Sequence, residues 1–153
     1  MRLLKRIGVL LLGLVALILL LLHLASIWFR MPDAKIAQLL EQSGVDYRIH
    51  RDTFAGTTLR WVEAGKLTSD RIIFFSHGAP GGFQDFAAYM VDSTLAERFR
   101  LISMDRPGYG YSDYGKAHPS ILDQVTAVRK VLEQYPLAEV WLVGYSYGGP
   151  IAA

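Results

Sequence analysis

The segment that most constrains what this chain can fold into is residues 140–150, VWLVGYSYGGP. It begins as a short apolar run rich in β-branched and aromatic residues, which is typical of a strand. The run ends at Gly144, and the small residues after it, with Pro150, suit the first turn of a helix. The pattern therefore predicts a strand, a tight turn and a helix, with Ser146 at the apex of the turn.

The amino-terminal segment carries a second strong signal. From Ile7 to Phe29 the sequence has about 23 residues without a formal charge, and leucine dominates them. At 1.5 Å per residue a helix of that length reaches roughly 35 Å, which is enough to cross a bilayer core. Trp28 and Phe29 fit the aromatic belt at a membrane interface. Three basic residues precede the run: Arg2, Lys5 and Arg6.

By the positive-inside rule, these basic residues hold the amino terminus in the cytoplasm and direct the rest of the chain across the membrane. A cleaved signal peptide is the alternative, but its apolar region would have about 7 to 15 residues and a small-x-small cleavage site, which Leu24-Ala25-Ser26 matches poorly. We therefore expect residues 1–30 to be a cytoplasmic basic tip and a single-pass transmembrane signal anchor. The remaining residues are then expected on the periplasmic or extracytoplasmic side.

Beyond this anchor, the sequence shows an alternation of strand and helix patterns. Residues 31–45 read as a linker or an amphipathic helix, and residues 46–153 as one partial domain. Period-two and apolar runs predict strands, and apolar residues at helical spacing predict helices. The expected strands are Tyr47–Phe54 and Thr57–Ala64, paired as a leading hairpin, then Arg71–Ser76, Leu101–Met104 and the run into Ser146; the expected helices cover 83–98 and 120–135. This order predicts an α/β fold with a mostly parallel βαβαβ arrangement.

Composition narrows the functional classes. The formal net charge is +2, from 16 Lys and Arg against 14 Asp and Glu, which offers no electrostatic case for binding nucleic acid. There is no cysteine, so thiolate catalysis and cysteine metal sites are excluded. The four histidines include no close pair, so we expect no metal site and no cofactor.

Three loops rich in glycine come after the predicted parallel strands: His77–Gly82, Asp105–Asp113 and Gly144–Gly148. Ligands of open α/β sheets bind beyond the carboxyl ends of the strands. We therefore expect these loops to converge on one edge of the sheet, which we call the rim.

In order along the chain, these three loops resemble those of the α/β-hydrolase superfamily, especially the branch of prolyl iminopeptidases and related, esterase-like serine hydrolases. The resemblance implies that Gly144-x-Ser146-x-Gly148 is a nucleophile elbow, in which a strained turn presents the serine hydroxyl. Ser146 would then cleave an ester, amide or peptide bond of a small-molecule, lipid or peptide substrate through an acyl-enzyme.

The resemblance also assigns roles to the neighbouring residues. The backbone N–H groups of Tyr147 and Ala79 would form the oxyanion hole, since Pro80 has no N–H to give. His77 and Gly78 would shape their loop, with His77 structural and not the general base. Asp105 would brace its own loop through Arg106 or backbone amides, and Gly144 and Gly148 would let the elbow form.

The superfamily's triad runs serine, then an acid, then histidine along the chain. Here only residues 147–153 come after Ser146, and none is acidic or histidine. We expect the chain to be the amino-terminal part of a longer serine hydrolase, inactive alone. The alternative is a non-catalytic, membrane-anchored half-domain that serves as a binding or interaction surface. An Asp or Glu and then a His further along the reading frame would separate the two.

Overall fold

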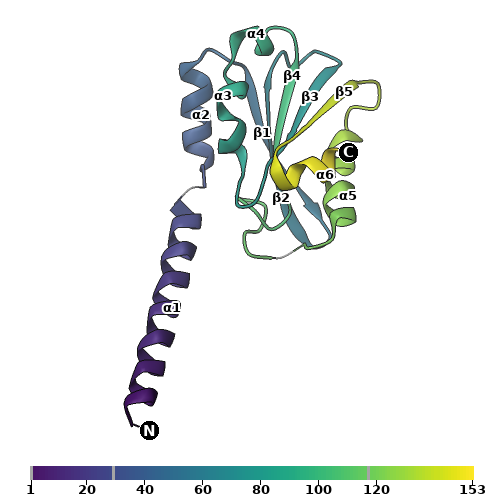
Figure 1. The fold of residues 1–153 in the computed structure, drawn as a ribbon. Coiled ribbons are helices and arrows are strands. Elements are labelled where there is room, and N and C mark those ends of the chain that lie inside the picture. Colours follow the sequence, from purple (N-terminus) through teal and green to yellow (C-terminus); the bar gives the residue numbers. More distant parts are fainter. Residues whose placement is uncertain (1, 29, 117) are drawn as a thin grey trace.

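A long helix precedes a five-stranded sheet that carries helices on both faces (Figure 1). The structure is a computed structural model that describes residues 2–28, 30–116 and 118–153. The helices are α1 (Arg2–Trp28), α2 (Asp33–Gln42), the 3-10 turn η1 (Phe83–Phe86), α3 (Ala87–Met90), α4 (Ser93–Ala96), α5 (Ile121–Leu132), the 3-10 turn η2 (Ser146–Gly148) and α6 (Gly149–Ala152). The strands are β1 (Tyr47–Phe54), β2 (Thr57–Gly65), β3 (Arg71–Ser76), β4 (Arg100–Asp105) and β5 (Glu139–Gly144).

The strand order is β1-β2-β4-β3-β5. β2 pairs antiparallel with both β1 and β4, whereas β3 pairs parallel with both β4 and β5. Ala55 and Gly56 form the hairpin turn, and both have positive φ, as two-residue turns between twisted strands require. The expected α/β fold, with its leading hairpin and its parallel βαβαβ segment, is confirmed.

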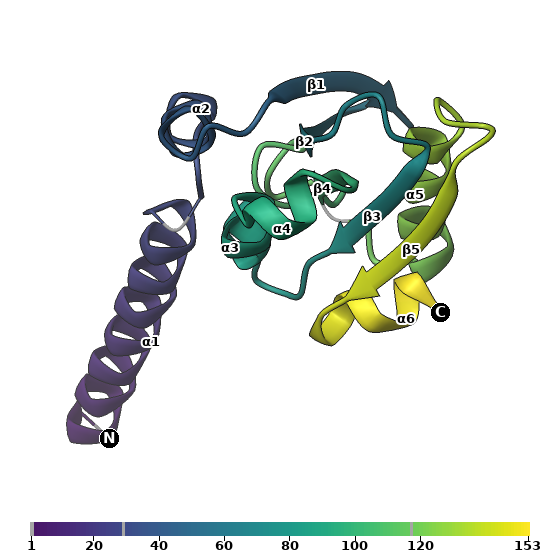
Figure 2. The same cartoon turned by 90° about the horizontal axis from the view of Figure 1, so that it is seen from above.

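The sheet separates two apolar cores, because successive strand residues point to opposite faces. Helices α3 and α4 lie on one face, and α5 and α6 on the other (Figure 2). The first core includes Val62, Phe75, Phe83, Met90 and Leu101. The second core includes Trp61, Phe74, Met104, Val128 and Ile151. Together they make a three-layer arrangement that buries β3 and β4, as is usual for parallel strands. The parallel strand β5 lies at the edge of the sheet and is largely exposed.

Helix α2 belongs to the first core. Ile36 and Leu40 are one turn apart on this helix, and both are fully buried among the core residues. The amphipathic pattern of residues 31–45 therefore packs onto the folded domain.

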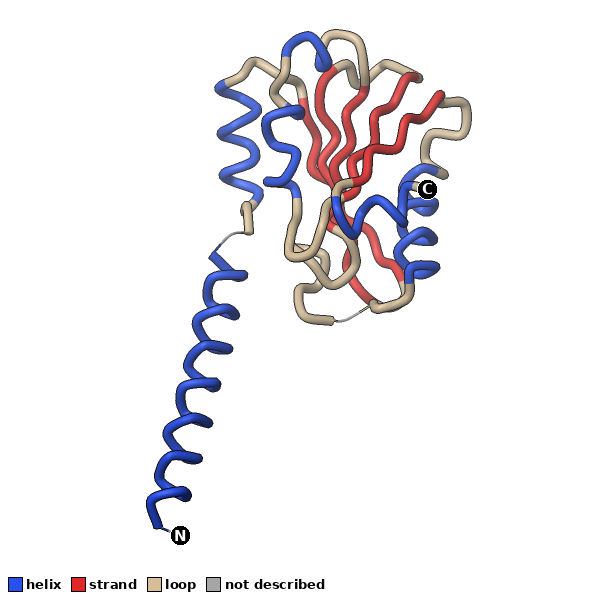
Figure 3. Tube along the Cα trace, viewed as in Figure 1, coloured by secondary structure: helices blue, strands red, loops and turns tan. Residues whose placement is uncertain are grey.

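The segment expected to form one helix over 83–98 is instead made of η1, α3 and α4. A short loop separates α3 from α4 (Figure 3). The break comes at Asp92, whose side chain accepts a hydrogen bond from the N–H of Leu95 and so starts α4 as an N-cap. The apolar spacing was correct about which face is buried, since Phe83, Phe86 and Met90 lie in the core. It was wrong about continuity.

Helix α1 stands apart from both cores. Its segment Lys5–Ala25 is long and apolar enough to cross a membrane, and none of it is buried against the domain. Trp28 is 89% exposed. Phe29, the other residue expected in an aromatic belt, lies outside the described residues.

Candidate active site

The elbow around Ser146 has the geometry of a strained turn. Strand β5 ends at Gly144, and Ser146 adopts a φ of 52°, which is sparsely populated for a residue with a side chain. A Cβ on Gly144 would lie 2.4 Å from the carbonyl oxygen of Gly148, and a Cβ on Gly148 would lie 2.0 Å from that of Ser76. Both flanking positions therefore exclude any side chain, because the helix after the turn folds back onto the strands.

The loop after β3 lies directly against this turn. A Cβ on Gly78 would come within 3.1 Å of the Cβ of Ser146 and 3.2 Å of a ring carbon of Tyr145. The N–H of Tyr145 also donates to the carbonyl oxygen of Ser76, at 3.0 Å. Residues almost 70 positions apart in the sequence thus meet at the rim.

The two backbone N–H groups that the resemblance assigns to an oxyanion hole belong to Ala79 and Tyr147. In the described part of the chain, neither N–H donates a hydrogen bond to another protein group. Unpaired backbone donors are uncommon in folded proteins unless solvent or a ligand accepts from them. Both donors lie in the two segments that meet at Ser146, so they are available to an incoming oxygen atom.

His77 is fully buried, and both of its ring nitrogens are engaged. Nε2 accepts from the backbone N–H of Arg106 at 2.9 Å, so Nδ1 carries the proton and donates to the carbonyl oxygen of Gly78 at 2.7 Å. Burial, helped by the charge of Arg106, lowers the pKa of His77 to about 3. The ring is therefore neutral at physiological pH and holds the two loops together.

Arg106, which the sequence suggested only as a partner of Asp105, is a buried residue of the site with a different set of contacts. Its Nε donates to the carbonyl oxygen of His77 at 2.9 Å, and its Nη2 donates to that of Gly78 at 2.7 Å. Nη1 reaches Oε1 of Gln124 on α5 at 3.3 Å. These bonds fix the backbone just before Ala79.

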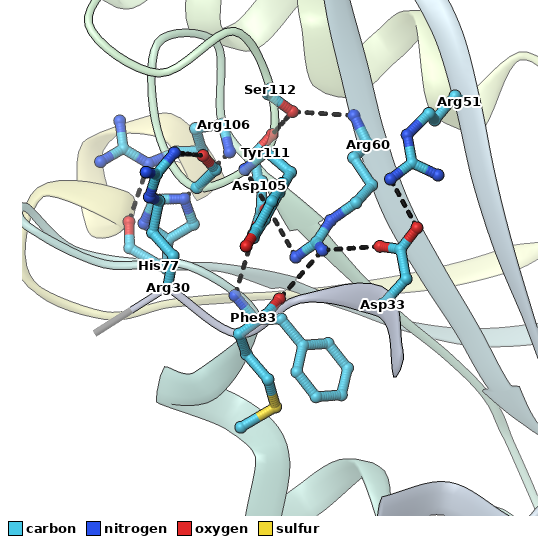
Figure 4. A network of polar contacts seen from close by, with 12 residues as sticks. Arg30, Asp33, Arg51, Arg60, His77, Phe83, Asp105, Arg106, Tyr111 and Ser112 are labelled. Carbon is cyan, nitrogen blue, oxygen red and sulfur yellow. Dashed lines mark hydrogen bonds and ion pairs between the residues drawn. The ribbon is translucent and has the colours of Figure 1, made fainter. Parts of the chain in front are cut away.

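Asp105 does brace its loop, but its charged partner is Arg60 on β2 and not Arg106. Nη2 of Arg60 lies 2.7 Å from Oδ2 of Asp105 (Figure 4). The carboxylate also accepts from the N–H of Phe83 at 3.0 Å and from the N–H of Tyr111 at 2.8 Å. Burial raises the pKa of Asp105, while Arg60 and these two N–H groups oppose that rise. Of the two kinds of partner expected for Asp105, the structure shows the backbone amides, and it adds Arg60.

Among the described residues, no hydrogen bond joins Ser146 Oγ to a histidine. His50 contacts Glu63 at 2.9 Å, and His118 contacts Thr57 at 3.5 Å. Within the same ranges, no three His, Asp or Glu side chains are grouped so that they could hold a metal ion.

Two pockets open beside the rim. One has a volume of about 160 Å³ and is lined by residues that include Arg30, Gly81 and Asp85. The other, of about 390 Å³, reaches Tyr147. Pro80, Tyr109 and Tyr114 line both pockets, so the two share a wall formed by the loops of the rim.

A family model described as the alpha/beta hydrolase fold matches residues 71–153, which carry β3, the three loops and the elbow. The chain belongs to the α/β-hydrolase family.

This α/β-hydrolase is similar to two curated bacterial proteins. It is 39% identical over 83 residues to a 2-succinyl-6-hydroxy-2,4-cyclohexadiene-1-carboxylate synthase from Escherichia coli, covering 52% of this chain and 30% of the relative. It is 33% identical over 96 residues to a pimeloyl-[acyl-carrier protein] methyl ester esterase from Yersinia pseudotuberculosis, covering 62% and 33%. The chain thus spans about a third of the length of these relatives.

Among solved structures, the α/β-hydrolase chain resembles a bacterial membrane phospholipase A. The TM-score is 0.62 at 22% sequence identity, over 92% of this chain and 45% of that one. At this identity the likeness concerns the fold.

Proposed function

We propose that this protein is a serine hydrolase that cleaves a carboxylic ester through an acyl-enzyme on Ser146. One observation carries the proposal. Ser146, whose φ is 52°, lies against the Gly78 backbone, and the backbone N–H groups of Ala79 and Tyr147 beside it have no hydrogen-bond partner in the described part of the chain. A nucleophile at a strained turn, with donors beside it, is the arrangement that acyl transfer requires. One curated relative is named as a methyl ester esterase, which favours an ester over an amide.

In the proposed reaction, Ser146 Oγ forms a bond to the acyl carbon while a base accepts its proton. The N–H groups of Ala79 and Tyr147 stabilise the oxyanion, and each such donor is typically worth about 3 kcal/mol in the transition state. The carbon–oxygen bond then breaks, and the alcohol leaves with the proton. Water attacks the acyl carbon, releases the acid and restores the Ser146 hydroxyl.

The base and its acidic partner are the groups that this reaction still requires. His77 cannot serve, because it is fully buried and both of its ring nitrogens are occupied. By the family's order, an Asp or Glu and then a His come after the nucleophile along the chain. Sequencing the reading frame beyond the codon for Ala153 tests this requirement directly.

We also propose that α1 anchors the protein in a membrane as a single span. Lys5–Ala25 has the required length and apolar character, and Lys5 and Arg6 begin it. The positive-inside rule then places the amino terminus in the cytoplasm and the hydrolase part on the periplasmic or extracytoplasmic side.

The activity test is ester hydrolysis by the product of the native reading frame, with α1 retained. We expect hydrolysis of a short-chain p-nitrophenyl ester and a loss of at least about a thousandfold in kcat for Ser146→Ala. Thermal unfolding of the variant provides the control for folding. An unchanged rate in Ser146→Ala would exclude Ser146 as the nucleophile and favour the non-catalytic alternative.

A further inference from the structure

The smaller pocket beside the rim contains a cation that no described side chain neutralises. Arg30 is the second residue after α1, and its Nη1 donates to the carbonyl oxygen of Gly110 at 3.3 Å. Its guanidinium lies 4.5 Å from the ring centre of Tyr114 and 5.3 Å from that of Tyr111. Within the described ranges, no acidic side chain pairs with Arg30, and its buried Nε has no hydrogen-bond partner. The guanidinium of Arg30 therefore lines the pocket with a positive charge that no described acidic side chain compensates.

The same pocket also presents a negative charge. Asp85 lines it, and no ion pair joins Asp85 to Arg30 in the described part of the chain. Tyr109 and Tyr114 line the pocket as well, and the guanidinium of Arg106 already lies 4.4 Å from the ring centre of Tyr109. The volume of about 160 Å³ accommodates a small polar group, since a water molecule occupies about 30 Å³ in the liquid.

The pocket is held close to the end of the helix proposed to cross the membrane. The ring of His23, in the last turns of α1, lies 6.2 Å from that of Tyr114. Buried Arg60 donates to the carbonyl oxygen of Met31 at 3.0 Å and also contacts Asp33 and Asp105 (Figure 4). The segment after α1 is thus bonded through Arg60 to Asp105, at the start of the rim loop Asp105–Asp113. In Figure 1, α1 leaves the domain on the side where this loop lies.

We infer that this pocket binds the headgroup of a zwitterionic phospholipid, with the phosphate on Arg30 and the amine facing Asp85. A guanidinium suits a phosphate because its donors match the phosphate oxygens. A pocket at the exit of a transmembrane helix lies at the level of the lipid headgroups. The inference rests on the proposed hydrolase function. The substrate of the hydrolase is then a membrane phospholipid, whose acyl ester extends toward Ser146 along the wall of Pro80, Tyr109 and Tyr114 that the two pockets share.

Binding of a diether phosphatidylethanolamine tests the site without hydrolysis, because ether-linked chains cannot be cleaved. The purified protein, with α1 retained, is titrated with this lipid in detergent micelles. We expect Arg30→Gln to raise Kd on the order of tenfold or more, as for the loss of a charge-assisted hydrogen bond. Arg30→Lys should restore part of the affinity. Arg51→Gln is the matched control, because Arg51 is 47% exposed and pairs with Asp33 outside the pocket.

Headgroup specificity tests the role of Asp85. Diether phosphatidylglycerol, which lacks the amine, should bind more weakly than the ethanolamine lipid, and Asp85→Asn should remove that difference. Equal binding of the two lipids by the unmodified protein would contradict a zwitterion site. Inorganic phosphate should compete only weakly; competition as strong as that of the lipid would show a site for free phosphate instead.

The outcomes also separate this inference from the proposed function. An unchanged Kd in Arg30→Gln overturns the headgroup site, even where Ser146-dependent hydrolysis is observed. Lipid binding that depends on Arg30, in a protein without Ser146-dependent hydrolysis, supports the site and overturns only the proposed activity. The unfolding temperature of each Arg30 variant shows whether a change in Kd comes from lost folding.

Discussion

Nη2 of Arg60 lies 2.7 Å from Oδ2 of Asp105, and both side chains are 1% exposed. The two residues are cross-strand partners, because the register of β2 against β4 places them opposite each other. The same guanidinium also contacts Met31 and Asp33, in the segment after α1. A single buried cation therefore connects the segment after α1, the sheet and a loop of the rim.

Replacing Arg60 should be strongly destabilising. Arg60→Met would leave the buried carboxylate of Asp105 without its cation, and breaking a buried pair in this way costs about 3–5 kcal/mol. Urea unfolding in detergent micelles, followed by tryptophan fluorescence, measures the change. Arg51→Met is the control: Arg51 is 47% exposed, so its loss should cost less than about 1 kcal/mol. Equal costs for the two variants would show that the buried pair contributes no more than a surface one.

Two adjacent glycines of the elbow should respond very differently to alanine. A Cβ at Gly148 would overlap the carbonyl oxygen of Ser76, at 2.0 Å, so Gly148→Ala should cost about 3 kcal/mol. A Cβ at Gly149 would meet nothing within 4 Å apart from its chain neighbours, so Gly149→Ala should cost clearly less than Gly148→Ala. Its remaining cost comes from Pro150, because the proline ring disfavours a helical conformation for a preceding residue that carries a Cβ. The same unfolding titration compares them, and equal stability of the two variants would argue against the close approach of the elbow to β3.

His77 should make stability fall at acidic pH. Its pKa is about 3 in the folded protein, against 6.5 for an unperturbed histidine, so the unfolded chain binds the extra proton first as the pH falls. The contribution of His77 to the free energy of unfolding is complete above about pH 6.5 and is lost progressively toward pH 3. In this range the free energy of unfolding should fall by up to roughly 1 kcal/mol per pH unit.

Unfolding titrations at several values between pH 7 and pH 4 test this slope. His77→Gln cannot take up the proton, so its stability should depend less on pH than that of the unmodified protein. Carboxylates titrate in both proteins, so the difference between the two slopes is the quantity to compare. Identical slopes would mean that His77 does not titrate in the way its burial requires.

Local patterns predicted the strands of this fold well. The hairpin bounds Tyr47–Phe54 and Thr57–Ala64 agree with β1 and β2 to within one residue, because period-two alternation and the Ala55-Gly56 turn are both local signals. The start of the expected helix at residue 120 also agrees with the structure, because Ser120 is the N-cap of α5 and its side chain accepts from the N–H of Asp123. The break in the 83–98 helix was missed because Asp92 acts as a cap within an otherwise helical apolar pattern.

The polar contacts of the site could not be predicted in the same way. Arg60 lies 45 positions before Asp105, and only the strand register brings them together. One signal was available: Arg60 interrupts an apolar stretch between Leu59 and Trp61, in a strand that the sheet buries on both faces. A charge at such a position requires a buried partner. Which carboxylate supplies it depends on tertiary pairing.

Covalent labelling of Ser146 tests the central proposal most directly. The product of the native reading frame, with α1 retained, is incubated with a fluorophosphonate, and the adduct is located by peptide mass spectrometry. We expect a single phosphonylated residue, Ser146, and no adduct in Ser146→Ala. A protein that is labelled at another residue, or a Ser146→Ala variant that is labelled as fully as the unmodified protein, would contradict the assignment of Ser146 as the nucleophile.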